Sequence, residues 1–103
     1  MNTGVLHQLI GRTVVRIDKV HDYIQLVLSG DAILSIFNRY QISTQCLGEI
    51  EGDQLLEASQ LAETISLKFS KGAVLSVGMG EADYSGPEAM ALHQKNKPTV
   101  IWN

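Results

Sequence analysis

The strongest constraint on the fold is an alternation of apolar and polar residues with a period of two, which is typical of strands that bury one face. The alternation is interrupted at Ser29-Gly30-Asp31 and then resumes. A three-residue loop at this point keeps all the apolar side chains on one face, whereas a two-residue loop would mix the faces. The pattern therefore predicts a β-hairpin with its buried side chains at Ile24, Leu26, Leu28, Ala32, Leu34 and Ile36.

The same pattern returns 41 positions later, around Ser70-Lys71-Gly72, where Gly72 stands at the loop position that favours a left-handed residue. The segments Gly11 to Phe37 and Gly52 to Gly78 share seven identical residues at 27 aligned positions. We interpret them as a possible internal repeat of two three-stranded meanders. The alternative is that any two amphipathic hairpins resemble each other. The second set of buried residues is Ile65, Leu67, Phe69, Ala73, Leu75 and Val77.

The chain is expected to form a single domain over residues 1–103, with a mainly β fold. We expect an antiparallel β-sandwich or partly open barrel of about eight strands with a short N-terminal helix, capped by Thr3 and ended by Gly11. Val5, Leu6, Leu9 and Ile10 share one face of that helix. The stretch from Tyr40 to Ile50 is the hardest to assign. The expected strands are Thr13–Val20, Asp22–Ser29, Ala32–Asn38, Gln54–Leu61, Glu63–Ser70, Ala73–Met79, Ala89–His93 and Thr99–Trp102.

Composition excludes several classes of protein. One cysteine, Cys46, cannot form an internal disulfide. The first residues carry neither the basic start nor the apolar stretch of a signal peptide or membrane anchor, so we expect a cytoplasmic protein. A net charge of −3 argues against nucleic-acid binding, which normally needs a basic face. We expect a monomer or weak dimer.

No residue pattern predicts catalysis, a cofactor or a metal site. His7, His21 and His93 are expected to be exposed, and a small hydrolase that pairs His21 with His93 is a minor alternative without supporting spacing. Cys46 has no neighbours that would activate a thiolate. The glycines of Val77-Gly78-Met79-Gly80 follow a strand, but no P-loop lysine follows them, which favours a bulge or sharp corner.

Acidic residues are concentrated in two groups. The sequence from Tyr40 to Leu67 contains no Lys or Arg, and a second group brackets Tyr84. If both groups share a face, they form a negative surface with an aromatic anchor, which suits a basic protein partner. The alternative is an ordinary solvated surface. The candidate partner-binding residues are Glu49, Glu51, Asp53 and Glu57 in the first group, and Glu81, Asp83, Tyr84 and Glu88 in the second.

The C-terminal third resembles a family of small bacterial β-proteins in the run Phe69 to Val77, in Gly86-Pro87-Glu88-Ala89 and in the terminal Val100-Ile101-Trp102-Asn103. Some proteins of this kind are cytoplasmic immunity proteins of contact-dependent growth inhibition systems, which are paired with nuclease toxins. The resemblance implies a turn at Gly86-Pro87-Glu88 and a core position for Trp102. This chain has Met90 where a tryptophan often follows the Glu-Ala pair.

The leading hypothesis is therefore an immunity protein that neutralises a basic toxin, most simply a ribonuclease, by occluding its active site through the acidic loops. Inhibition by occlusion needs a rigid scaffold and no chemistry of its own, so the protein would not be an enzyme. The alternative is a small β-barrel that binds a hydrophobic small molecule inside an incompletely filled core.

Overall fold

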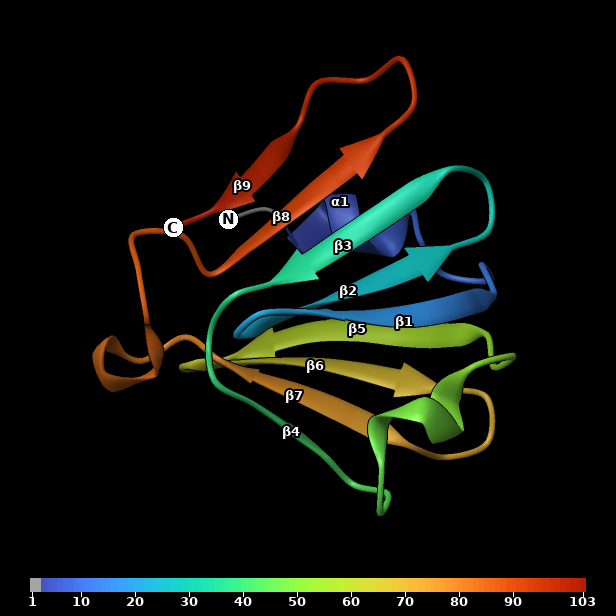
Figure 1. Cartoon of the computed structure of the whole chain (residues 1–103), viewed down its shortest axis with the longest axis horizontal. Coiled ribbons are helices and arrows are strands. Elements are labelled where there is room, and N and C mark those ends of the chain that lie inside the picture. The colour runs from blue at the N-terminus through green and yellow to red at the C-terminus, as the bar shows by residue number, and fades with distance from the viewer. Residues whose placement is uncertain (1–2) are drawn as a thin grey trace.

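The structure, a computed structural model that describes residues 3–103, consists of two antiparallel sheets that face each other across one core (Figure 1). The first sheet has the order β1 (Val14–Val20), β2 (Tyr23–Leu28), β3 (Ala32–Ile36), β8 (Met90–Gln94) and β9 (Val100–Trp102). The second has the order β4 (Tyr40–Ile42), β7 (Val74–Gly78), β6 (Thr64–Phe69) and β5 (Leu55–Leu61). The expected mainly β sandwich with one short helix is confirmed, with β4 as an additional strand.

Both predicted hairpins are present with three-residue loops. Leu28 pairs with Ala32 across the β2–β3 loop, and the Phe69 N–H donates to the Ala73 carbonyl across the β6–β7 loop. Gly72 has the expected left-handed backbone, with φ of +96°. All twelve side chains expected on the two apolar faces are buried, and so is Trp102. The period-two pattern therefore specified the core.

The two halves of the chain are equivalent in geometry, as well as in pattern. β1 and β5, and likewise β2 and β6, correspond at a shift of 41 residues, and each pair of strands contains a bulge at the same place, between Val14 and Arg16 and between Leu55 and Glu57. These matches define an approximate two-fold relation between the sheets. Descent by duplication stays a prediction, because geometry alone does not establish ancestry.

Backbone hydrogen bonds join the starts of β1 and β5 in a reciprocal arrangement. The Val14 N–H donates to the Asp53 carbonyl at 2.8 Å, and the equivalent Leu55 N–H donates to the Arg12 carbonyl at 3.0 Å. Thr13 and Gln54 form an isolated antiparallel bridge between these bonds. Farther along the two strands, backbone groups at the equivalent positions Ile17 and Ala58 contact side chains. The Ile17 N–H donates to Glu51, and the Ala58 carbonyl lies 2.9 Å from His7 Nε2.

The halves also exchange strands. After β3 the chain crosses to the second sheet, where β4 pairs with β7, and after β7 it crosses back, so that β8 pairs with β3 (Figure 1). The two crossing segments meet beside each other. The Phe37 N–H donates to the Ala89 carbonyl, and the Arg39 N–H donates to the Asp83 carbonyl, both at 2.9 Å. This crossover positions the candidate site.

Short helices occupy the remaining segments. α1 (Thr3–His7) ends three residues earlier than the apolar spacing suggests, which leaves Ile10 beyond the helix and 43% exposed while Leu6 and Leu9 are buried. The predicted cap depends on the side chain of Thr3, which is not among the side chains that the structure describes. The unassigned stretch forms β4 and the 3₁₀ helix η1 (Leu47–Ile50), and η2 (Glu81–Asp83) precedes β8. No helix within residues 3–103 is long and apolar enough to cross a membrane.

A substitution of Lys71 tests whether an ion pair helps to hold the β6–β7 loop against the join between β1 and β5. Its Nζ lies 3.7 Å from Oδ1 of Asp53, whose side chain is 1% exposed. We expect Lys71→Met to lower the free energy of unfolding by about 1 kcal/mol, because it leaves a buried carboxylate without a counter-charge; the exposure of Lys71 keeps the effect modest. The loss should be much smaller in an Asp53→Asn background. Urea unfolding followed by Trp102 fluorescence measures both values, and equal losses in the two backgrounds would contradict this assignment.

Candidate functional site

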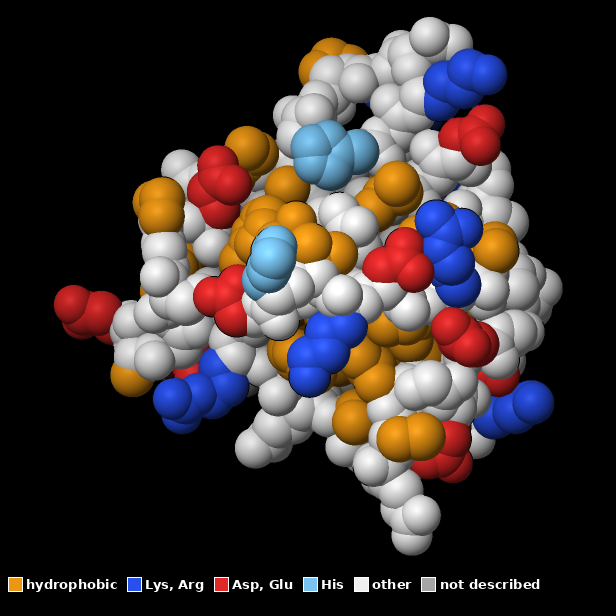
Figure 2. All heavy atoms as spheres, viewed as in Figure 1, with side chains coloured by type: hydrophobic (Ala, Val, Ile, Leu, Met, Phe, Trp, Pro, Cys, Tyr) orange, Lys and Arg blue, Asp and Glu red, His pale blue; other side chains and the backbone are white. Residues whose placement is uncertain are grey.

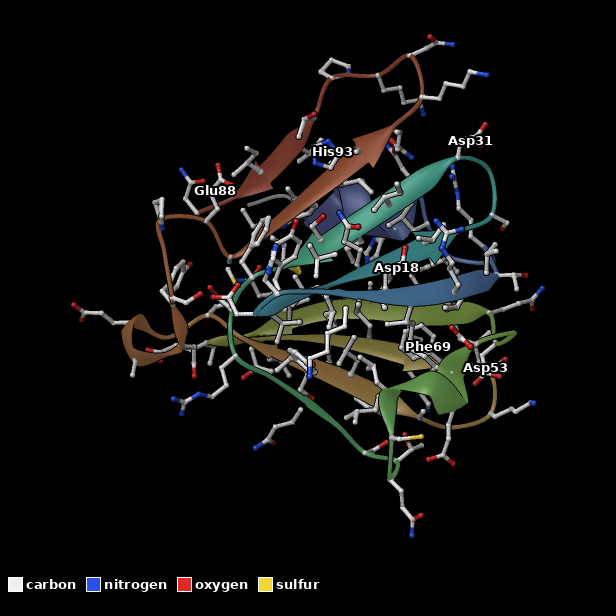
Figure 3. All side chains as sticks on the ribbon, in the orientation of Figure 1. Asp18, Asp31, Asp53, Phe69, Glu88 and His93 are labelled. Carbon is white, nitrogen blue, oxygen red and sulfur yellow. The ribbon has the colours of Figure 1, made fainter. Side chains whose placement is uncertain are left out.

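The two acidic groups lie at opposite ends of the molecule. In Figure 1, η1 and the start of β5 are at the right, whereas η2 is at the far left. In Figure 3, Asp53 and Glu88 are correspondingly far apart. The groups therefore do not form the single negative face considered from the sequence. The reason is the order of the elements. η1 follows β4, at the end of that strand away from the crossing segments, whereas η2 lies in the segment that crosses from β7 back to β8.

Most side chains of the first group contact other residues of the fold. Glu49 Oε2 accepts from the Cys46 N–H at 3.0 Å, and Glu51 Oε2 accepts from the Ile17 N–H at 2.9 Å. Glu57 stands opposite Lys68 across the β5–β6 pair. Asp53 is 2% exposed, so its carboxylate is not part of the molecular surface.

Two members of the second group, Asp83 and Tyr84, line a hollowed part of the surface, whereas Glu81 and Glu88 are not among its lining residues. Glu81 is exposed, while Asp83, Tyr84 and Glu88 are half-buried. Asp83 is fixed by two contacts with Gly80: its N–H donates to the Gly80 carbonyl at 2.9 Å, and its Oδ2 accepts from the Gly80 N–H at 3.2 Å. η2 is tied to the crossing segment between β3 and β4 by the Arg39 N–H, which donates to the Asp83 carbonyl at 2.9 Å.

Two adjoining hollows form what we call the crossover groove. One, of about 210 Å³, lies over the outer face of the second sheet, and the other, of about 350 Å³, extends toward the β1–β2 turn. Both are lined by Arg39, Tyr40 and Asp83. The first hollow adds Gln41, Thr64, Ser76 and Gly78, and the second adds Asp22, Phe37, Asn38, Ala82, Tyr84 and Ser85.

The groove combines acidic and aromatic groups with one basic side chain. Asp22 and Asp83 line it, and Arg39 is the basic residue among its lining residues. Tyr40, Tyr84 and Phe37 provide aromatic surface. No pairing between Arg39 and a carboxylate occurs among the ion pairs of residues 3–103. This arrangement suits a ligand that carries positive charge and apolar or planar surface.

Asn38 is the most buried polar residue of the groove, with 2% exposure. Its Nδ2 donates to the Gly78 carbonyl at 2.7 Å, which ties the first crossing segment to the end of β7. Its Oδ1 has no hydrogen-bond partner in the structure as described. A buried acceptor without a donor is costly, and it is satisfied when a donor reaches it.

Sequence reasoning found part of this site and missed the rest. Glu81, Asp83 and Tyr84 were identified from the acidic pattern. Arg39 and Tyr40 were not, because the crossing from β3 to β4 leaves no periodic signal. The glycines at 78 and 80 were the available signal, since glycine at a strand end often indicates the close approach of another group.

The other candidates for chemistry show no assembled centre. Cys46 is exposed and caps η1, and His93 Nδ1 lies 3.1 Å from Thr99 Oγ1 on the outer face of the first sheet (Figure 3). The residues that the structure describes contain no group of three or more His, Cys, Asp or Glu side chains that could hold a metal ion. Another hollow, of about 380 Å³ and lined partly by Val15, Val27 and Ile33, lies on the outside of the first sheet.

Comparisons with known proteins add no assignment: no family model matches the chain, and no curated protein or solved structure matches it. The site must therefore be judged from its own residues.

Gly78 offers a direct test of the groove's construction. A side-chain carbon on Gly78 would collide with the carboxyl group of Asp83. We expect Gly78→Ala to lower the free energy of unfolding by about 1–3 kcal/mol. Removing the carboxylate as well, in Gly78→Ala/Asp83→Ala, should recover part of that loss, as measured by urea unfolding.

Gly48→Ala is the matched control, because a side-chain carbon on Gly48 would meet no atom within 4 Å. Its effect should stay within about 0.5 kcal/mol. Equal stability of the Gly78→Ala and Gly48→Ala variants would show that the Asp83 carboxylate does not occupy the space above Gly78.

Proposed function

We propose that this protein is an inhibitor of a basic protein toxin, of the immunity-protein type, and that the crossover groove and η2 form its docking surface. The observation that carries the proposal is the groove itself, where Asp22 and Asp83 line the same hollow as three aromatic side chains, and the exposed Glu81 stands in the adjoining η2. Aromatic residues dominate binding energy at protein interfaces, and acidic groups attract a basic partner and orient it.

The remainder of the molecule supports a scaffold role. Both hairpins have fully buried apolar faces, and the groove lies where two crossing segments are hydrogen-bonded to each other. A surface held in this way loses little conformational freedom on binding. Inhibition would follow if the acidic rim covered the basic channel that a ribonuclease uses to hold phosphate groups. Such an inhibitor would act in the cytoplasm, without catalysis or a cofactor of its own.

The proposal is tested by charge-neutral variants at the two ends of the molecule. We expect Asp22→Asn/Glu81→Gln/Asp83→Asn to bind a basic partner captured from the native host at least about 30-fold more weakly than the unmodified protein. The matched variant Asp31→Asn/Glu49→Gln/Glu57→Gln removes the same charge away from the groove and should bind within about threefold of it. Affinities are measured at low and high salt by surface plasmon resonance.

Inhibition is measured separately, by RNA cleavage with the purified partner in the presence of each variant. We expect the unmodified protein and the control variant to block cleavage and the groove variant to fail. Loss of binding in the control variant alone would place the interface on the first acidic group. Binding that occurs without any inhibition would contradict the inhibitor proposal.

A further inference from the structure

Because the two halves are related by an approximate two-fold, each position in one half can be compared with the equivalent position in the other. Tyr23 and Phe37, whose ring centroids are 4.8 Å apart, pack against each other at a tilt of 56° on the outer face of the first sheet. At a shift of 41 residues their equivalents on the second sheet are Thr64 and Gly78, which are partners across the β6–β7 pair. The second half thus has a small hydroxyl side chain and no side chain where the first half has two aromatic rings.

Carboxyl groups occupy the space next to Gly78 that a larger side chain would fill. The carboxyl group of Asp83 lies where a side chain on Gly78 would stand. A side-chain carbon on Gly80 would lie 2.6 Å from Glu63 Oε2 and 3.2 Å from Asp83 Oδ2, so these two oxygens are within about 6 Å of each other. Gly78 and Gly80 therefore allow Asp83, which lines the crossover groove, and Glu63, which precedes the lining residue Thr64, to converge beside the groove.

Among the described residues neither carboxylate forms an ion pair, and Arg39, which lines both hollows with Asp83, is not paired with it. Within residues 3–103, the ion pairs are Arg16 with Asp18 and Lys71 with Asp53, so Glu63 and Asp83 have no cationic partner within 4 Å. Two like charges this close repel each other, and a cation between them would relieve the repulsion. The arrangement differs in this respect from Asp53, where Lys71 supplies the compensation.

The surroundings indicate which cation would fit. Tyr40 lines the hollow together with the polar side chains of Gln41, Thr64 and Ser76. In the adjoining hollow, Asn38 is buried and its Oδ1 lacks a donor. A cation with several hydrogen-bond donors and an extended stem satisfies carboxylates and amide oxygen while it packs on an aromatic ring.

From these observations we infer that the crossover groove binds a lysine or arginine side chain of a partner protein, with Asp83 and Glu63 as the charged acceptors and Tyr40 as the wall. The inference rests on the proposed function in that the partner is basic, and it assigns the residues of this chain that recognise it. Glu63, which belongs to the acidic stretch from Tyr40 to Leu67 but is not among the candidate partner-binding residues predicted from the sequence, becomes a specificity-determining residue.

The experiment uses the full chain and small probes, so that no partner is required. ¹⁵N-labelled protein is titrated with Nα-acetyl-arginine-N-methylamide, with the lysine analogue and, as the neutral control, with the norleucine analogue. We expect both basic probes to shift the amide signals of Thr64, Gly78 and Gly80 with a Kd on the order of 10 mM, as suits one side chain without its protein. The norleucine analogue should leave these signals in place.

Variants then locate the charged acceptors. In Glu63→Gln/Asp83→Asn the shifts at Thr64, Gly78 and Gly80 should fall at least about tenfold at equal probe concentration, because neutral acceptors hold a cation more weakly. The matched variant Glu49→Gln/Glu57→Gln should retain them in full. Unchanged shifts in the groove variant, or equal shifts with norleucine, would overturn the inference.

A titration with CaCl₂ distinguishes a different occupant. If Ca²⁺ shifts the three amides and the basic probes do not, the groove is a divalent-cation site and the inference is wrong. The result is also separable from the proposed function. Probes that fail to bind, alongside a partner that depends on Asp22 and Glu81, would contradict the inference alone; probes that bind, without any toxin being inhibited, would contradict the proposed function alone.

Discussion

The join between β1 and β5 is the contact on which the arrangement of the two sheets depends. Reciprocal backbone hydrogen bonds link Val14 to Asp53 and Leu55 to Arg12 at the start of the two strands. Beyond this point the two strands belong to different sheets, and both sheets contribute to one core (Figure 1). The join brings the apolar faces of two hairpins together, and neither hairpin could bury its face alone.

The core could be read from the sequence because a strand with one buried face imposes a period of two, and both hairpins obey it without exception. β4 and η1 could not be read, since three- and four-residue elements are too short to show a period. Asp53 illustrates a different limit. Asp53 stands in an acidic stretch, where a solvated side chain is expected. The join between β1 and β5 buries it instead, next to Lys71 in the loop between β6 and β7.

The candidate site was only partly accessible from the sequence for a related reason. Glu81, Asp83 and Tyr84 are neighbours along the chain, so their grouping was visible. Arg39 and Thr64 are distant in sequence but line the same groove. They meet because the segment that crosses from β3 to β4 carries Arg39 to the second sheet, where Thr64 begins β6. Figure 2 shows that acidic and basic side chains are otherwise interspersed over the visible face, so net charge alone does not single out this region.

Strand exchange between the halves also has a consequence for how the chain reaches this structure. β8 must return to β3, although the paired Ile36 and Met90 are 54 positions apart in the sequence. Pairings over such distances raise the entropic cost of the folding transition state and slow folding. On the ribosome, the free edge of β3 would stay uncovered until β8 emerged, so strands synthesised after the whole second sheet would complete the first sheet.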